Sequence, residues 1–287
     1  MTNRMELAKT MQERVLTLGE ILKHAFGLLN ERCSSFFLVV LLVYLPVNFV
    51  LQFAMMQVDY TVTELELLAA EMMDVGIVQI VLSFLELVAL AVAAVVVHNR
   101  IFGQKKLPFG TVFYRGVRSW LRAVMSVMVI MLGMMLCILS MSMMFLMPGM
   151  AMMLLPVLLL LMVIYVLMQH CCCTAAALRG YWGLRNIRYV SLVLKGYMGK
   201  AIGNTAVILL ITGGASMIFN MLLSNMLEFI SNEWIALAVN VGFSTLFSML
   251  TVYGYVAGSL LFLNIEEKKR REAEIARQMA EQQRQQF

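Results

Sequence analysis

Long runs of apolar residues dominate the chain, and six of them contain almost no charged side chain. A helix needs about 20 consecutive apolar residues to cross a membrane, and each run reaches that length. We therefore expect an all-α, polytopic membrane protein with six transmembrane helices. A single membrane domain, 1–265, is expected to be followed by a charged cytoplasmic tail, 266–287. The spans are expected at 35–56, 76–97, 123–146, 150–169, 201–223 and 235–263.

A stretch with helical periodicity precedes the first apolar run. Thr17 and Glu20 have the spacing of a capping box, in which each side chain satisfies a free backbone amide at the start of a helix. Apolar residues then recur every three or four positions, and charged residues lie on the other side. Because such a helix can bury only one side, we expect it to lie in the membrane plane. The apolar positions are Leu18, Ile21, Leu22, Ala25 and Leu29.

The order of an amphipathic stretch followed by two apolar runs occurs three times, beginning near Thr17, Phe109 and Leu184. We therefore expect three transmembrane hairpins, each preceded by a cytoplasmic in-plane amphipathic helix. Internal repeats of this kind often place a shared cleft at the repeat interface. In the third unit the expected apolar stripe is Leu184, Ile187, Val190, Ser191 and Leu194.

Charged side chains are distributed unevenly between the two sides of these spans. Hydrophobic residues make up 61% of the chain and charged residues only 14%, which excludes an ordinary soluble domain. All 22 Lys and Arg residues fall on one side, which the positive-inside rule places in the cytoplasm together with both termini. The charged residues of the opposite side are all acidic: Asp59, Glu64, Glu66, Glu71, Asp74, Glu228 and Glu233.

Glu86 is the only acid or base within an expected span, and it lies near the middle of the second one. A charge there costs about 3 kcal/mol on insertion scales, so we expect Glu86 to face the bundle interior in its neutral form. Two interpretations remain open: proton coupling or ligand contact, and a protonated carboxyl bonded to Asn48, Asn220 or Asn240. Asn48 and Gln52 lie four residues apart, so both can reach one neighbouring helix.

Small residues and proline are expected to shape the spans. Pro46 is expected to kink the first span, because proline removes a backbone donor. Gly213 and Gly214 on the fifth span, with Gly254 and Gly258 on the sixth, are expected to let helices approach closely. The sixth span also has a polar stripe that suits either helix contacts or the lining of a pathway. The members of that stripe are Asn240, Ser244, Ser248 and Thr251.

Basic residues flank the apolar positions of the second and third amphipathic stretches. Such residues suit anionic lipid headgroups, at about 1 kcal/mol per charge near the membrane surface. A membrane protein partner or a second copy of the chain could occupy the same surface, whereas nucleic acid is a poor alternative because these residues are tied to the bilayer. The candidate headgroup-binding residues are Arg115, Arg118, Arg122, Arg185, Arg188 and Lys195.

His170 and the cysteines that follow it raise the question of a metal site. His170 with Cys171, Cys172 and Cys173 could bind a soft metal, and thiols at a membrane edge are acylation candidates. Adjacent residues on a helix point about 100° apart, so only some of them could reach one ion. We therefore expect small packing residues here and assign no metal, cofactor or catalytic residue.

The segment Gly183–Gly196 has the sequence GLRNIRYVSLVLKG and comes just before the fifth span. It resembles a segment of bacterial six-span proteins, namely the YciC-like proteins and the membrane domain that precedes some glycerophosphodiester phosphodiesterases. Leu45-Pro46 and the overall layout are also similar. The resemblance implies a multi-pass protein of the bacterial inner membrane, and it implies that enzymatic activity belongs to a separate soluble domain. Only the tail follows the last span, so no such domain is expected here.

These observations predict a non-enzymatic integral membrane protein whose basic cytoplasmic surface helices bind anionic lipid or a protein partner. The alternative is a small transporter or exporter permease subunit that uses Glu86 in a cleft between the repeats. An enzyme is not expected, because the sequence contains no nucleophile elbow, phosphate-binding glycine loop or zinc-protease motif.

Overall fold

The computed structural model describes residues 2–58, 65–103, 107–145 and 150–285. Helices make up 91% of the structure, and the described residues include no strand, which confirms the expected all-α class. Six helical segments in the described ranges are long and apolar enough to cross a membrane, in agreement with the expected number. These segments are Cys33–Met56, Met73–Phe102, Phe109–Leu139, Leu155–Arg179, Met198–Leu227 and Glu233–Arg284.

The described chain forms ten α-helices and one π-helical turn, Val40–Tyr44. The longest helix, α10, has 53 residues and continues without a break into the charged tail, so the expected domain boundary at residue 265 is not a break in the helix. The helices are α1 (Thr2–Glu13), α2 (Leu18–Glu31), α3 (Cys33–Val39), α4 (Leu45–Met56), α5 (Leu65–Phe102), α6 (Phe109–Phe145), α7 (Met150–Arg179), α8 (Gly183–Leu194), α9 (Met198–Leu227) and α10 (Glu233–Gln285).

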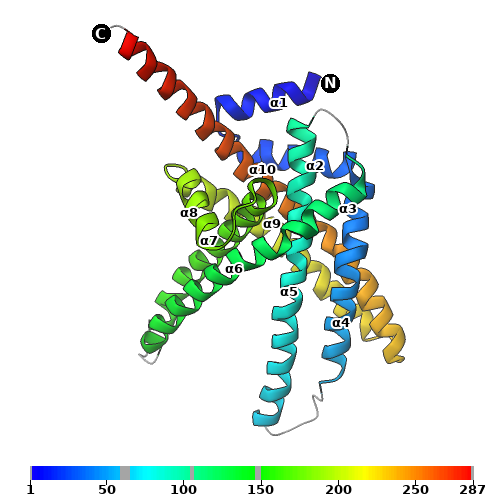
Figure 1. The fold of residues 1–287 in the computed structure, drawn as a ribbon. Helices are drawn as coiled ribbons and strands as arrows, with labels where there is room; N and C mark the ends of the chain where they lie inside the picture. The colour runs from blue at the N-terminus through cyan, green and yellow to red at the C-terminus, as the bar shows by residue number, and fades with distance from the viewer. Residues whose placement is uncertain (1, 59–64, 104–106, 146–149, 286–287) are drawn as a thin grey trace.

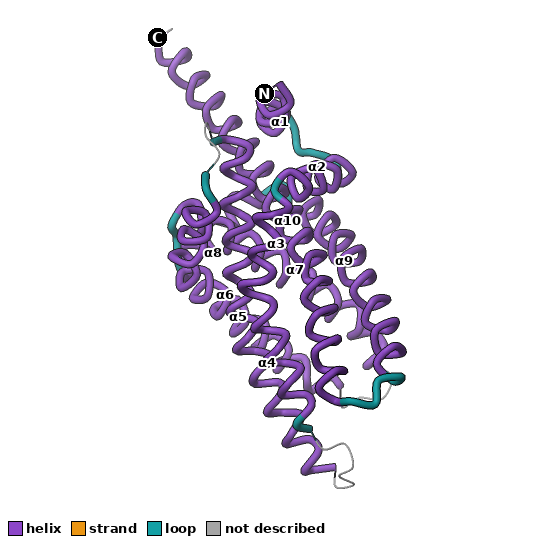
Figure 2. The backbone as a smooth tube through the Cα atoms, turned by 90° about the vertical axis from the view of Figure 1, so that its right-hand side faces the viewer, coloured by secondary structure: helices purple, strands orange, loops and turns teal. Residues whose placement is uncertain are grey.

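Figures 1 and 2 show that both termini lie at one end of the helical bundle. We call this the termini end, and it also carries α1, α2, α8 and the C-terminal part of α10. The opposite end, which we call the loop end, is where α4, α6 and α9 finish and where α5, α7 and α10 begin. The centre of the bundle is formed by α5, α7 and α10, because these three helices contact one another and most of the other long helices.

A wider helical turn precedes Pro46 in the first crossing. The segment Val40–Tyr44 is π-helical, and the Leu45 N–H donates to the Val40 carbonyl, five residues back. Proline lacks an N–H and its ring crowds the turn before it, and a single π turn is a known local adjustment in such a helix. The expected disturbance at Pro46 therefore takes the form of an inserted π turn, and Tyr44 in this turn is buried.

The second amphipathic stretch is not a separate helix, contrary to the expectation. Helix α6 runs unbroken from Phe109 to Phe145, so the segment that carries Arg115 and Arg118 is the first part of a crossing helix. No proline interrupts this segment, and an uninterrupted backbone hydrogen-bond ladder is the favourable state in a membrane. Separate short helices do precede the other two pairs of crossings, as α2 and α8.

The packed side of α8 differs from the expected apolar stripe. Val190 and Leu194 are fully buried, as expected, but Leu184 is 73% exposed and Ser191 is exposed as well. The side that packs against the bundle includes Asn186, which is fully buried. The prediction from apolar positions alone was therefore centred on the wrong side of the helix, because the side that packs includes the polar residue Asn186.

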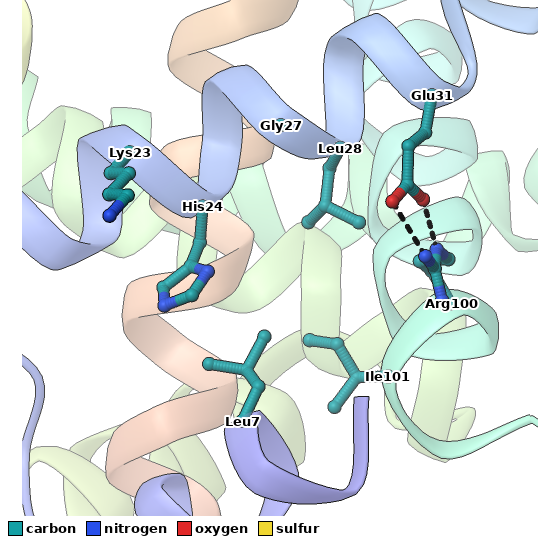
Figure 3. Close-up of a pocket in the computed structure, with 8 residues that line it drawn as sticks. All are labelled: Leu7, Lys23, His24, Gly27, Leu28, Glu31, Arg100 and Ile101. Carbon is teal, nitrogen blue, oxygen red and sulfur yellow. Dashed lines mark hydrogen bonds and ion pairs between the residues drawn. The ribbon is translucent and has the colours of Figure 1, made fainter. Parts of the chain in front are cut away.

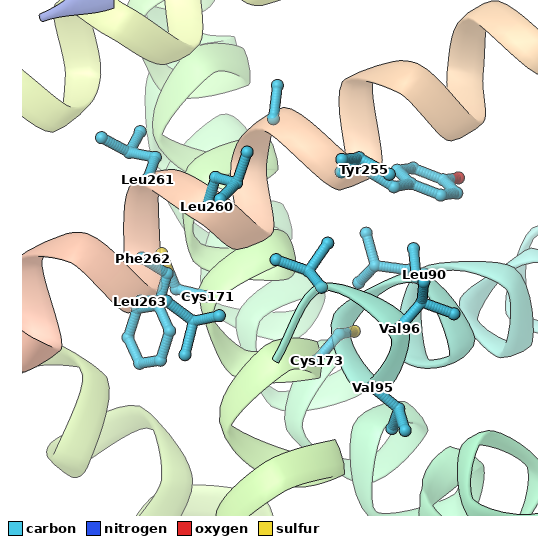
Figure 4. Close-up of a cluster of buried hydrophobic side chains, with 14 of the residues drawn as sticks. Leu90, Val95, Val96, Cys171, Cys173, Tyr255, Leu260, Leu261, Phe262 and Leu263 are labelled. Carbon is cyan, nitrogen blue, oxygen red and sulfur yellow. The ribbon is translucent and has the colours of Figure 1, made fainter. Parts of the chain in front are cut away.

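Asn186 joins α8 to two crossing helices next to the adjacent cysteines. Its Nδ2 donates to Ser126 Oγ of α6 at 2.9 Å and to the Cys172 carbonyl of α7 at 2.8 Å. Cys171, Cys172 and Cys173 are all buried, and Figure 4 shows Cys171 and Cys173 among apolar side chains. This placement agrees with the packing interpretation and leaves no exposed thiol for acylation at these positions.

The segment between α1 and α2 is held against α10 by one buried amide. Asn264 Oδ1 accepts the Leu16 N–H at 2.7 Å, while its Nδ2 donates to the Met11 and Arg14 carbonyls at 3.2 and 3.0 Å. Asn264 is fully buried. A single side chain thus bonds to three backbone groups in the last turn of α1 and the connection that follows it, which fixes the N-terminal helices at the termini end.

Candidate intramembrane site

A cavity of about 440 Å³ lies between α4, α5, α9 and α10, within the segments that could cross a membrane. Four of the five polar residues singled out in the sequence line it, namely Asn48, Gln52, Glu86 and Asn220. The fifth, Asn240, donates its Nδ2 to Gln52 Oε1 at 2.8 Å. The structure therefore brings residues from four separate helices to one polar space.

The polar stripe of α10 forms one wall of this cavity. Ser244, Ser248 and Thr251 line it from successive turns of the helix. Asn48 on α4 reaches across, and its Nδ2 lies 3.3 Å from Thr245 Oγ1 and 3.4 Å from Ser248 Oγ. The expectation that Asn48 and Gln52 bond to a neighbouring helix is thus confirmed. Both residues also line the cavity.

A second cavity, of about 270 Å³, lies next to the first on the side of the loop end. Gln52 and Asn240 line it together with Glu233, the first residue of α10. The Asn240–Gln52 hydrogen bond therefore lies where the two cavities meet. Asn240 is itself oriented by Ser244, whose Oγ lies 3.2 Å from Asn240 Oδ1.

Glu86 is the only carboxyl among the residues that line the larger cavity, and that lining includes no Lys, Arg or His. Among the described residues, no hydrogen bond or ion pair engages the Glu86 carboxyl. The described structure contains no bond from Glu86 to Asn48, Asn220 or Asn240, and two of these amides bond to α10 or to Gln52 instead. The carboxyl is left available to a proton or to a ligand.

The larger cavity is closed on the side of the termini end. Tyr44 lines it there, and the Tyr44 hydroxyl donates to the Tyr255 hydroxyl at 3.1 Å. Both tyrosines are buried, and the His170 ring packs edge-on against Tyr255 with ring centroids 5.4 Å apart. Beyond them lies the apolar core, which includes Tyr255 and the cysteines (Figure 4). The cavity consequently has polar space toward the loop end and dense packing toward the termini end.

Five of the six basic candidates lie on α6 and α8, which pack together near the termini end, and the sixth, Lys195, directly follows α8. All six side chains are exposed, and none forms an ion pair within the described part of the chain. The guanidinium carbon of Arg185 lies 5.1 Å from the centre of the Tyr181 ring. On α8 the basic residues share the outward side with exposed Leu184 and Leu192. This side of α8 therefore exposes both apolar and cationic side chains.

Another cavity, of about 270 Å³, lies at the termini end between α1, α2 and α5 (Figure 3). Glu31 and Arg100 line it and pair with each other, with Arg100 Nη2 2.7 Å from Glu31 Oε1. Burial lowers the pKa of His24 on the same wall. Because its only acid is already paired with a base, this cavity is a weaker candidate for a ligand than the one at Glu86.

Sequence reasoning missed several residues of the intramembrane cavity, although helical spacing pointed to some of them. Gln79 lies seven residues before Glu86, and Ser216 lies four residues before Asn220, so each shares a helix side with a predicted candidate. Tyr44 lies four residues before Asn48 in the same way. Phe247 also lines the cavity, but nothing in the sequence distinguished it from the other apolar residues of its helix.

Comparisons of the chain with protein families, with curated proteins and with solved structures found no match. The resemblance to the YciC-like proteins therefore stays a prediction. The candidate site is defined by its geometry alone.

Proposed function

We propose that this protein is a non-enzymatic membrane transporter that binds a small solute in the intramembrane cavity and couples its movement to protonation of Glu86. The cavity carries this proposal, because it places an unpartnered carboxyl among polar side chains from four helices inside the membrane-crossing region. Ionisable residues within membrane spans commonly mark substrate or proton pathways. A purely structural glutamate would instead be expected to bond to a neighbouring helix.

The proposed cycle begins with entry of the solute from the loop end, which the positive-inside rule places outside the cytoplasm. The Gln52–Asn240 hydrogen bond lies between the outer and inner cavities, so its opening admits the solute to Glu86. Release on the cytoplasmic side requires Tyr44 and Tyr255 to separate, because their hydroxyls and the core behind them close that side. This is alternating access around a fixed site near the membrane midplane.

Proton flux in proteoliposomes with an entrapped pH-sensitive dye tests the proposal. With an imposed pH gradient and a panel of small solutes, wild-type protein is expected to carry protons faster than protein-free vesicles. Glu86→Gln keeps the size of the side chain but cannot exchange a proton, so we expect at least a tenfold loss of flux. Glu86→Asp serves as the matched control. Equal flux for wild type and Glu86→Gln, with a lower melting temperature of the variant, would show that Glu86 is structural.

The basic surface of α6 and α8 supports a second proposed function, the binding of anionic lipid headgroups on the cytoplasmic side. Its six exposed cations lack acidic partners in the described structure and lie beside exposed apolar side chains. Native mass spectrometry is expected to detect retained anionic lipid. The double substitution Arg115→Ala, Arg188→Ala should reduce that retention, whereas Arg277→Ala in the tail should not. Equal retention by both variants would contradict this function.

A further inference from the structure

We infer that the cavity at Glu86 takes a small organic ammonium ion, an inference that rests on the proposed transport function and names the class of its solute. The first argument is charge. The cavity lining contains one carboxyl and no basic side chain, and the described structure gives that carboxyl no hydrogen bond or ion pair. An isolated carboxylate in a poorly solvated site is costly, and a positively charged ligand removes that cost more directly than a neutral or anionic one.

The remaining wall of the cavity suits a nitrogen cation with carbon substituents. Phe247 lines the cavity, and its ring is stacked on Phe219 with centroids 4.0 Å apart. Ammonium groups are attracted to aromatic faces, while the amide oxygen atoms of Gln79 and Asn48 can accept N–H donors. A bare divalent metal ion would instead need several oxygen ligands within about 2.6 Å. The volume of about 440 Å³ lies within the range of small-molecule pockets.

The path toward the cavity carries the matching charge. Glu233 lines the outer cavity beside Gln52. Glu228 follows the end of α9, five residues before Glu233, and Asp74 lies in the part of α5 that begins at the loop end. The sequence places no Lys, Arg or His between residues 33 and 97 or between residues 201 and 267. An entry region that carries charges of one sign raises the local concentration of ions of the opposite charge. Entry and binding site therefore select for the same class of solute.

Thiol labelling with reagents of opposite charge tests this inference without knowledge of the natural solute. The test position is Asn220→Cys, which lines the cavity from α9, in a background with Cys33→Ser and Cys137→Ser. Methanethiosulfonates that carry trimethylammonium or sulfonate are compared, each normalised to its rate with a free thiol. We expect the cationic reagent to react at least tenfold faster in the protein. Tetramethylammonium should slow that reaction, and acetate or tert-butanol should not.

Glu86 variants and a control position identify the source of this preference. Glu86→Gln should bring the normalised ratio close to one, whereas Glu86→Asp should keep it. Ser224→Cys, exposed on α9 outside the cavity lining, should show a ratio that does not respond to Glu86→Gln. Protection by tetramethylammonium needs no change at Glu86, so it remains decisive if Glu86→Gln fails to fold.

The outcomes separate the class of solute from the transport function. Equal protection by acetate or tert-butanol, or a ratio near one with Glu86 intact, would overturn the ammonium assignment even if proton flux depends on Glu86. Selective protection by tetramethylammonium in a protein that carries no protons would leave the binding site in place and remove the transport function.

Discussion

At the scale of single residues, buried amides carry much of the tertiary specificity of this apolar protein. Asn186 is fully buried and donates to both Ser126 Oγ and the Cys172 carbonyl, which joins α8 to α6 and α7. Asn186→Ala removes both bonds from a fully buried position, so we expect the free energy of unfolding to fall by about 1–3 kcal/mol. Denaturant titration in detergent micelles measures this change. Asn225→Ala, at an exposed position, is the control and should change it by less than about 0.5 kcal/mol.

A second residue-scale prediction concerns pH. The capping box expected at the start of α2 is confirmed, with Thr17 and Glu20 bonded reciprocally. A hydrogen bond from Arg14, with Nη1 2.9 Å from Glu20 Oε2, and the Thr17 backbone N–H lower the pKa of Glu20 to about 2. The unfolded value is about 4.3, so this carboxylate stabilises the fold above that pH and loses its contribution as the pH falls toward 2.

The expected result is a difference between the wild type and Glu20→Gln that shrinks on acidification. Melting temperatures measured from pH 7 to pH 2 should show a lower value for the variant at neutral pH. The gap should begin to shrink below about pH 4 and should close near pH 2. Other carboxylates titrate in both proteins alike. A difference in melting temperature that stays constant across this range would mean that Glu20 stabilises the fold through its packing and not through its charge.

At the scale of helices, close approach depends on glycines that the sequence identified only in part. A Cβ built on Gly258 of α10 would lie 2.6 Å from His170 Nδ1 of α7, whereas one built on Gly214 of α9 meets nothing within 4 Å. Gly258→Ala is therefore expected to lower the free energy of unfolding by about 1–3 kcal/mol through overpacking. Gly214→Ala should leave it unchanged or raise it by up to about 1 kcal/mol, because alanine favours helix. Similar destabilisation by both variants would contradict the close α7–α10 packing.

The same glycines show what the sequence could predict about helices and what it could not. Hydropathy predicted all six helices that are long and apolar enough to cross a membrane, because length and apolarity are properties of each segment by itself. Which glycine lies against a neighbour depends on helix rotation, and the expected close approach at Gly213 and Gly214 is wrong. Polar periodicity was more informative: Asn48 and Gln52 bond to α10 as expected, since polar groups in a membrane interior must find partners. The sequence could not show that no described residue forms a hydrogen bond or ion pair with the Glu86 carboxyl, because that depends on how the helices pack.

At the scale of the whole molecule, the proposed roles of the basic surface and of the cavity both depend on the termini end facing the cytoplasm. The described Lys and Arg residues lie toward the termini end, and each would cost about 3 kcal/mol in the middle of a membrane and favours the cytoplasmic side. The cavity at Glu86 is closed on that side by Tyr44 and Tyr255. A protein inserted in this way presents its polar space outward, and the reverse orientation would present it to the cytoplasm.

Single cysteines at the two ends test this orientation in intact cells. In a background with Cys33→Ser and Cys137→Ser, Ser231→Cys at the loop end and Gln282→Cys in the tail are both exposed positions. A membrane-impermeant maleimide should label Ser231→Cys in intact cells and Gln282→Cys only after permeabilisation. The opposite pattern would invert the molecule, so the cavity would face the cytoplasm and the proposed direction of entry would be wrong. Labelling of both positions in intact cells would show that α10 does not cross the membrane, because the tail and the loop end would then share one side of it.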